Sequence, residues 1–173
     1  MIKTACYRVG QFFRGLTARV SDEEAERATR TLTAEAQALF RRQTIQDQRH
    51  ALAVYGAIRQ AGHTNPHLLA AALLHDAGKA AARLSPVHRS IIVLLGRFAP
   101  SLLARLSQGE PRSWNRPFVV HAQHPQIGAR WAEEAGCSPL AVALIRRHEE
   151  KQIVVQTEQD RLLAILQAVD DAN

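Results

Sequence analysis

Six residues with side chains that commonly bind transition metals fall at positions expected to face the inside of helices or to cap them. They are four histidines and two aspartates: His50, His75, Asp76, His124, His148 and Asp170. Imidazole nitrogens and carboxylate oxygens that converge inside a helical bundle are the usual materials of a transition-metal centre. The set predicts one or two divalent ions and leaves iron, manganese, nickel, cobalt and zinc open.

Any one of these histidines, taken alone, is better explained as a core residue with satisfied hydrogen bonds. The whole set resists that explanation, because four inward histidines and two inward aspartates without buried bases would leave unpaired charge in the core. Six ligands also exceed the four that a structural zinc ion needs. Two ions that share a carboxylate are therefore the simplest hypothesis.

The stretch from Leu68 to Lys79 (LLAAALLHDAGK) organises the predicted fold around two of these ligands. If it forms one helix, with about 100° between successive residues, Asp76 and Lys79 lie on the same face as Leu68. His75 also falls beside this face. We therefore expect three polar side chains to point inward from the end of an apolar helix.

The other elements are also expected to be helices. Apolar periodicity and capping residues predict helices over about 22–43, 46–61, 86–107 with a break at Pro100, a helix that begins at Pro125 and ends near 135, one from Pro139, and one from about 158 to the end. Residues 108–117 are expected to be an irregular loop. Residues 1–20 predict a short amphipathic helix that docks on the domain, with a membrane-surface or partner contact as the alternative.

Composition favours a single all-α domain in a chain of 173 residues. Hydrophobic residues make up 46%, charged residues 22% and aromatic residues 5%. Two cysteines without a CxxC motif, and apolar runs too short for a transmembrane or secretory segment, predict a cytoplasmic protein. The net charge of +6 suits anionic partners. The arginines are spread out, so nucleic acid is a possible but not a favoured partner.

Taken in order, the six residues resemble the signature of the HD-domain metal-dependent phosphohydrolases. The H…HD…D pattern corresponds to His50, His75, Asp76 and Asp170, and the extra histidines of two-metal members to His124 and His148. Local sequence agrees: LLHDAGK (73–79) is similar to the family's HDIGK form, HPQIGA (124–129) to its HPxxGA element and RRHEE (146–150) to its second His-bearing helix. The resemblance covers roughly residues 45–173, so residues 1–44 are expected to be a helical extension packed on this core.

The resemblance implies a helical bundle of the HD-domain type and hydrolysis of a phosphomonoester, phosphodiester or phosphoanhydride. Asp76 would bridge two ions and orient a metal-activated hydroxide, while Lys79 would contact substrate phosphate. Four further anion contacts are proposed only from their proximity to the motifs in sequence: Arg83, His88, Arg116 and Arg147. His63, His67 and His121 are expected to be structural or surface residues.

The substrate is expected to be a nucleotide or a similar small phosphorylated molecule. The chain lacks the GYP motif of cyclic-di-GMP phosphodiesterases, whereas its histidine set also resembles that of bacterial diadenosine tetraphosphate hydrolases. Three alternatives stay open: a non-catalytic, metal-stabilised regulatory or interaction module, a nucleic-acid-directed phosphodiesterase, and a homodimeric form of any of these.

Overall fold

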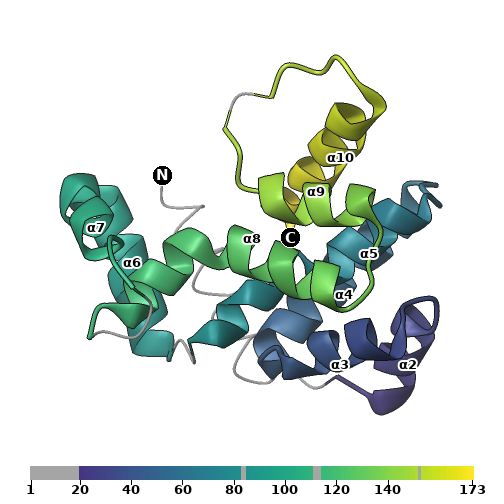
Figure 1. Ribbon diagram of the computed structural model, residues 1–173, viewed down its shortest axis with the longest axis horizontal. Coiled ribbons are helices and arrows are strands. Elements are labelled where there is room, and N and C mark those ends of the chain that lie inside the picture. Colours follow the sequence, from purple (N-terminus) through teal and green to yellow (C-terminus); the bar gives the residue numbers. More distant parts are fainter. Residues whose placement is uncertain (1–19, 83–84, 111–113, 152) are drawn as a thin grey trace.

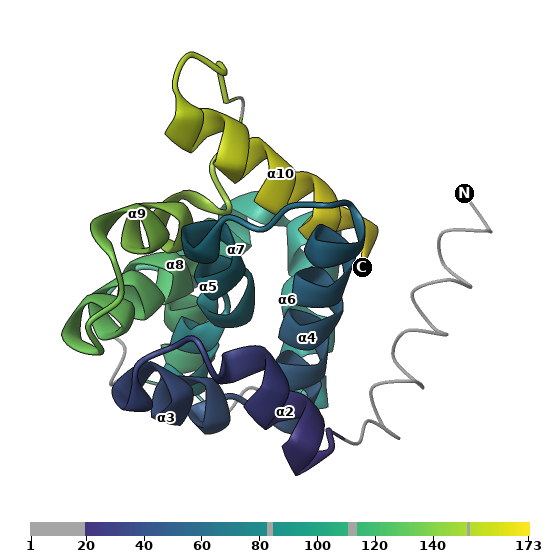
Figure 2. The same ribbon diagram turned by 90° about the vertical axis from the view of Figure 1, so that its right-hand side faces the viewer.

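The computed structural model describes residues 20–82, 85–110, 114–151 and 153–173, which form helices joined by turns, with no strand among them (Figures 1 and 2). This agrees with the predicted all-α class. In chain order the elements are α2 (Asp22–Thr29), α3 (Ala34–Arg42), α4 (Ile45–Gln60), α5 (Pro66–Leu74), the 3-10 helix η1 (Ala77–Ala81), α6 (Pro86–Phe98), α7 (Pro100–Leu106), α8 (Arg116–Glu134), α9 (Pro139–Arg147) and α10 (Glu158–Ala172).

The segment expected to be one helix over 22–43 is two helices, so that prediction was wrong. α2 ends at Thr29, and Thr33 caps α3 by accepting a hydrogen bond from the backbone N–H of Ala36. The Thr33 hydroxyl also donates to the carbonyl oxygen of Ala135, at 2.6 Å. A threonine that satisfies the free N–H groups of a helix start favours a new helix over continuation of the old one. The break lets α3 place Phe40 in the core.

The end of α5 also differs from the prediction of one helix as far as Lys79. Asn65 caps the helix and Pro66 is its first residue, but α5 ends at Leu74 and the chain enters η1 through Asp76, with φ −94° and ψ 0°. The cause is close packing of η1 against α8. A Cβ on Gly78 would lie 2.0 Å from the carbonyl oxygen of His124, so only glycine fits at this position.

Helix α8 is continuous through Pro125, which was expected to begin a helix. The helix starts at Arg116 and Pro125 lies inside it. A proline in a helix interior removes one backbone hydrogen bond and costs about 3 kcal/mol. Here the carbonyl oxygen that it leaves free, that of His121, accepts a hydrogen bond from a side chain instead.

The remaining helices follow the sequence closely. α6 and α7 are separated at Pro100 as predicted, α9 begins at Pro139 and α10 at Glu158, close to their predicted starts. Most buried apolar residues form one cluster that includes Phe40, Ile58, Leu68, Leu144 and Leu163. A small second cluster of Ala82, Ile92 and Val120 joins η1, α6 and α8. Arg83 and the predicted helix over 1–20 lie outside the described residues, apart from Val20.

No helix within the described part of the chain combines the length and the apolar character needed to cross a bilayer.

Candidate metal centre

Five of the six predicted ligands form two groups that share Asp76. His50, His75 and Asp76 make the first group, and Asp76, His124 and His148 make the second. Within each group the candidate ligand atoms lie within 4.8 Å of one another. The residues come from α4, from the turn between α5 and η1, from α8 and from the end of α9. Elements far apart in sequence therefore bring their imidazoles to one place.

The carboxylate of Asp76 lies between the two groups, with one oxygen toward each. Its Oδ2 lies 3.6 Å from His75 Nε2. Its Oδ1 lies 3.3 Å from His124 Nε2 and 3.7 Å from His148 Nε2. A carboxylate in this position can supply a separate oxygen to each of two cations.

Asp170 joins the first group from the last turn of α10. Its Oδ1 lies 2.7 Å from His50 Nε2 and 3.4 Å from His75 Nε2. The neighbouring Asp171 is exposed, as its place on the helix predicted. The structure therefore brings together all six predicted ligands.

Three of the histidines are held in the same way, by a hydrogen bond from Nδ1 to the carbonyl oxygen three residues earlier. The Nδ1–O distances are 3.0 Å for His75 with Ala72, 2.6 Å for His124 with His121, and 2.7 Å for His148 with Ile145. A carbonyl oxygen only accepts, so Nδ1 must carry the hydrogen. In a neutral ring Nε2 then keeps its lone pair, and that atom faces the acids.

These carbonyl oxygens are available because the next residue does not offer its backbone N–H in the helical position. In a regular α-helix the oxygen of residue i−3 accepts from the N–H of residue i+1. α5 ends at Leu74 and α9 at Arg147, one residue before His75 and His148. α8 continues past His124, but the next residue is Pro125, which has no N–H. Two helix ends and one proline thus each leave a carbonyl oxygen free to hold Nδ1 of a histidine.

Electrostatics keep the acids ionised and His148 neutral. Burial, helped by His75, lowers the pKa of His148 to about 3. Burial opposes ionisation of Asp76, but Lys79 and His75 outweigh it and hold its pKa well below the usual range. Burial likewise opposes ionisation of Asp170, but the neighbouring His50 and His75 outweigh it and lower its pKa. Anionic carboxylates and a neutral imidazole are the forms that bind metal ions.

The donor atoms fit a cation better than they fit one another. Nε2 of His75 is fully buried and has no hydrogen-bond partner among the described residues. Nε2 of His124 and Nε2 of His148 lie 3.3 Å apart, and with Nδ1 protonated in both rings neither has a hydrogen to donate. A buried nitrogen without a hydrogen bond is costly, and so are two opposed lone pairs where both rings are neutral. A bound metal ion would satisfy all three nitrogens.

Lys79 lies directly beside the shared carboxylate. Its ammonium group donates to Asp76 Oδ2 at 2.6 Å. Burial opposes its charge, but Asp76 more than compensates and raises the pKa of Lys79. A permanently charged lysine at this position can hold one more anionic group next to Asp76.

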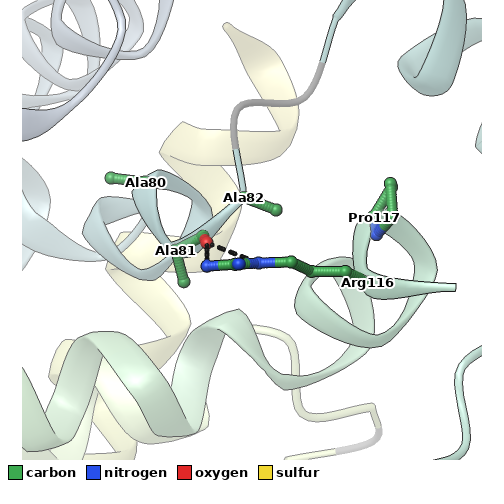
Figure 3. Close-up of a pocket in the computed structure, with 5 residues that line it drawn as sticks. All are labelled: Ala80, Ala81, Ala82, Arg116 and Pro117. Carbon is green, nitrogen blue, oxygen red and sulfur yellow. Dashed lines mark hydrogen bonds between the residues drawn. The ribbon is translucent and has the colours of Figure 1, made fainter. Parts of the chain in front are cut away.

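Among the described residues, the other predicted anion contacts bind groups outside the six-residue cluster. Arg116 donates from its guanidinium to the carbonyl oxygen of Ala81, at the edge of an open hollow of about 380 Å³ that Ala80, Ala82 and Pro117 also line (Figure 3). Arg147 pairs with Glu150 at 2.7 Å and with Asp160 at 3.0 Å. His88 Nδ1 lies 2.8 Å from the Ser85 hydroxyl at the start of α6. These three side chains are committed to local structure.

Two residues near the second group were not among the predicted ligands. Glu149 Oε1 lies 3.6 Å from His124 Nε2, and the His121 ring stacks on that of His124 with centroids 6.1 Å apart. His121 was expected to be structural or at the surface. Its spacing of three residues from His124 would have placed both on one helix face. Glu149 follows the end of α9, where helical spacing gives no guidance.

A second open hollow, of about 280 Å³, borders this group. Pro125, Arg147 and Glu149 are among its lining residues. Neither hollow is lined by the six candidate ligands themselves.

Comparisons of the chain with protein-family models, with curated proteins and with solved structures found no match.

Proposed function

We propose that the protein is a metal-dependent phosphohydrolase of the HD-domain type that acts on a nucleotide or a similar small phosphorylated molecule. The observation that carries the proposal is the position of Asp76, which turns one carboxylate oxygen toward each of two histidine groups. A site built only to stabilise a fold needs one closed set of ligands. Two ligand groups around a shared carboxylate exceed this need, and they favour catalysis.

The side chains would serve as ligands of a first ion, as ligands of a second ion and as a contact to substrate phosphate. His50, His75, Asp76 and Asp170 would hold one ion, and Asp76, His124 and His148 the other. Divalent ions in such a site lower the pKa of a bound water and neutralise charge on phosphoryl oxygens. Lys79 would bind a phosphoryl oxygen and stabilise the added charge of the transition state. The backbone carbonyls that hold Nδ1 of three histidines keep the site rigid, which reduces reorganisation during the reaction.

A hydrolysis screen, in which chromatography separates each substrate from its products, tests this function. The full chain, loaded with manganese or with iron, is offered nucleotides, dinucleoside polyphosphates and cyclic nucleotides. We expect turnover of at least one class, and loss of that turnover on chelation. Bound metal with no turnover on any class would instead favour a metal-stabilised interaction module. Hydrolysis that chelators leave unchanged would contradict the proposal.

Replacing Pro125 by alanine tests how His124 is positioned. The new N–H would compete with His124 Nδ1 for the carbonyl oxygen of His121. We expect manganese affinity at one of two sites to fall by about 10- to 100-fold, as for other losses of a partner behind a metal ligand. The thermal midpoint of the metal-free protein should not fall, because alanine supplies the backbone N–H that proline lacks inside α8.

Calorimetric titration with manganese and thermal melts in chelator provide the two measurements. Pro139→Ala is the matched control, since Pro139 occupies the first turn of α9, where no backbone hydrogen bond is lost. Unchanged affinity in Pro125→Ala would show that the proline does not position His124.

A further inference from the structure

Helix α6 carries an apolar stripe on the side that faces away from the protein. Val87, Ile91, Leu94 and Phe98 follow one another at intervals of four, three and four residues, which places them on one helix face. Their exposed fractions lie between 38% and 77%. Ile92, on the opposite side of α6, is buried against Ala82 and Val120. Both sides of this helix are therefore apolar, although only one packs on the protein.

Helices α6 and α7 lie at the end of the molecule away from α9 and α10 (Figure 1). α7 packs against α6 where Leu103 approaches Gly96, and Leu102 on α7 is exposed. Neither helix carries any of the six candidate metal ligands. We define the α6–α7 face as Val87, Ile91, Leu94, Phe98 and Leu102.

The charge around this face has one sign. No aspartate or glutamate occurs anywhere from residue 77 to residue 109. Arg97 and Arg105 are exposed and have no carboxylate partner among the described residues, and the Arg97 guanidinium lies 5.8 Å from the centre of the Phe98 ring. Arg89 is the exception, because it forms an ion pair with Asp47 at 2.9 Å. Apolar side chains bordered by unpaired arginines suit a partner with an apolar layer beneath an anionic one.

The positive charge argues against a second copy of the chain and against residues 1–19 as the partner of this face, and the apolar stripe argues against a nucleic acid. A second copy of the chain would bring Arg97 and Arg105 toward a surface that carries the same arginines. Residues 1–19 contain Lys3, Arg8, Arg14 and Arg19 and no acid, so they also have the wrong sign. A nucleic acid would match the arginines and leave the apolar stripe in water.

We propose that the α6–α7 face binds the surface of an anionic lipid membrane. Val87, Ile91, Leu94 and Phe98 enter the boundary between headgroups and acyl chains, and Arg97 and Arg105 pair with acidic headgroups. Amphipathic helices with arginine on the polar side and large apolar residues on the other bind membranes in this way. The candidate ligands are not part of this face, because they lie on other elements, with His124 buried in the middle of α8.

Vesicle co-sedimentation with the full chain tests the proposal. The probes are vesicles of phosphatidylcholine alone and vesicles of phosphatidylcholine mixed with phosphatidylglycerol. We expect binding to the mixed vesicles that weakens as salt is added, and little binding to phosphatidylcholine alone. The double variant Leu94→Glu/Phe98→Glu should bind the mixed vesicles at least about tenfold more weakly, because two inserted apolar groups become charges.

The matched control is Val154→Glu/Val155→Glu. These two residues are 71% and 51% exposed on the connection between α9 and α10, far from the α6–α7 face along the chain. This control should bind as the original chain does, and circular dichroism should show both variants folded. A second pair, Arg97→Gln/Arg105→Gln, should lose the preference for anionic lipid and keep the fold.

Three results would overturn the proposal. One is the absence of binding to mixed vesicles. Another is equal binding by the Leu94→Glu/Phe98→Glu variant, which would assign the contact to another segment such as residues 1–19. The third is a dimer in sedimentation velocity that this variant converts to a monomer, which would show that a second copy covers the face.

Discussion

Replacing Asp76 by alanine is expected to abolish metal-dependent substrate hydrolysis while the protein stays folded. Asp76 is the only residue that belongs to both histidine groups, so its loss removes a ligand from each. Losing a partner behind a ligand already costs about 10- to 100-fold in affinity or activity. Losing the shared ligand itself should therefore reduce turnover by more than about 100-fold. Removing one buried carboxylate also frees Lys79 from its ion pair.

The measurement combines substrate hydrolysis with metal content. We expect the variant to keep its helical circular dichroism spectrum and to bind less metal than the original chain does. His63→Ala is the control, because His63 lies outside both groups and its substitution should leave turnover unchanged. Turnover of Asp76→Ala equal to that of the original chain would remove Asp76 from the mechanism.

Replacing Gly78 by alanine is expected to give the largest loss of stability of any single methyl addition we can identify. The new Cβ would lie 2.0 Å from the carbonyl oxygen of His124 and 2.7 Å from the amide nitrogen of Gly128. Both contacts are with backbone, so no side-chain rotation relieves them. Overpacking typically costs 1–3 kcal/mol and sometimes more, and we expect about 3 kcal/mol or more here. In a chain of this size that lowers the thermal midpoint by about 6–12 °C.

The same substitution should also disturb the site, because η1 carries Lys79 and α8 carries His124. Manganese affinity of the folded variant should fall together with its stability. Gly56→Ala is the matched control: Gly56 lies inside α4, and a Cβ there meets no atom within 4 Å. That change should stabilise the protein by about 0.5–1 kcal/mol. A midpoint for Gly78→Ala equal to that of the original chain would contradict the close packing of η1 on α8.

Local sequence signals predicted several helix starts and one break, and they failed where a helix end depends on packing against a distant element. The caps Asn65 and Ser138 and the break at Pro100 follow from local chemistry, and each was found as expected. The end of α5 depends instead on the approach of α8 to Gly78, a contact between residues far apart in sequence. No local pattern reports such a contact. Asp76 and Lys79 were therefore expected to point inward for a partly wrong reason.

The convergence of the six side chains could be predicted, because imidazoles and carboxylates on the apolar face of a helix are costly unless they are paired or bound to a metal. Which carboxylate lies between the groups could not be derived from spacing, and came only from the family resemblance. The predicted anion contacts were chosen only by their proximity in sequence, which does not say where a side chain points. Arg116 and Arg147 are near the motifs in sequence, but their guanidinium groups are held by a backbone carbonyl and by two carboxylates.

The six-ligand cluster is tested most directly by anomalous diffraction from crystals of the manganese-loaded protein. We predict two anomalous peaks per chain, one bounded by His50, His75 and Asp170 and the other by His124 and His148, with the Asp76 carboxylate between them. Substrate hydrolysis should require both of these bound ions. Crystals that bind manganese elsewhere, or that bind none while all six side chains stay in place, would contradict the metal centre and the hydrolase function that rests on it.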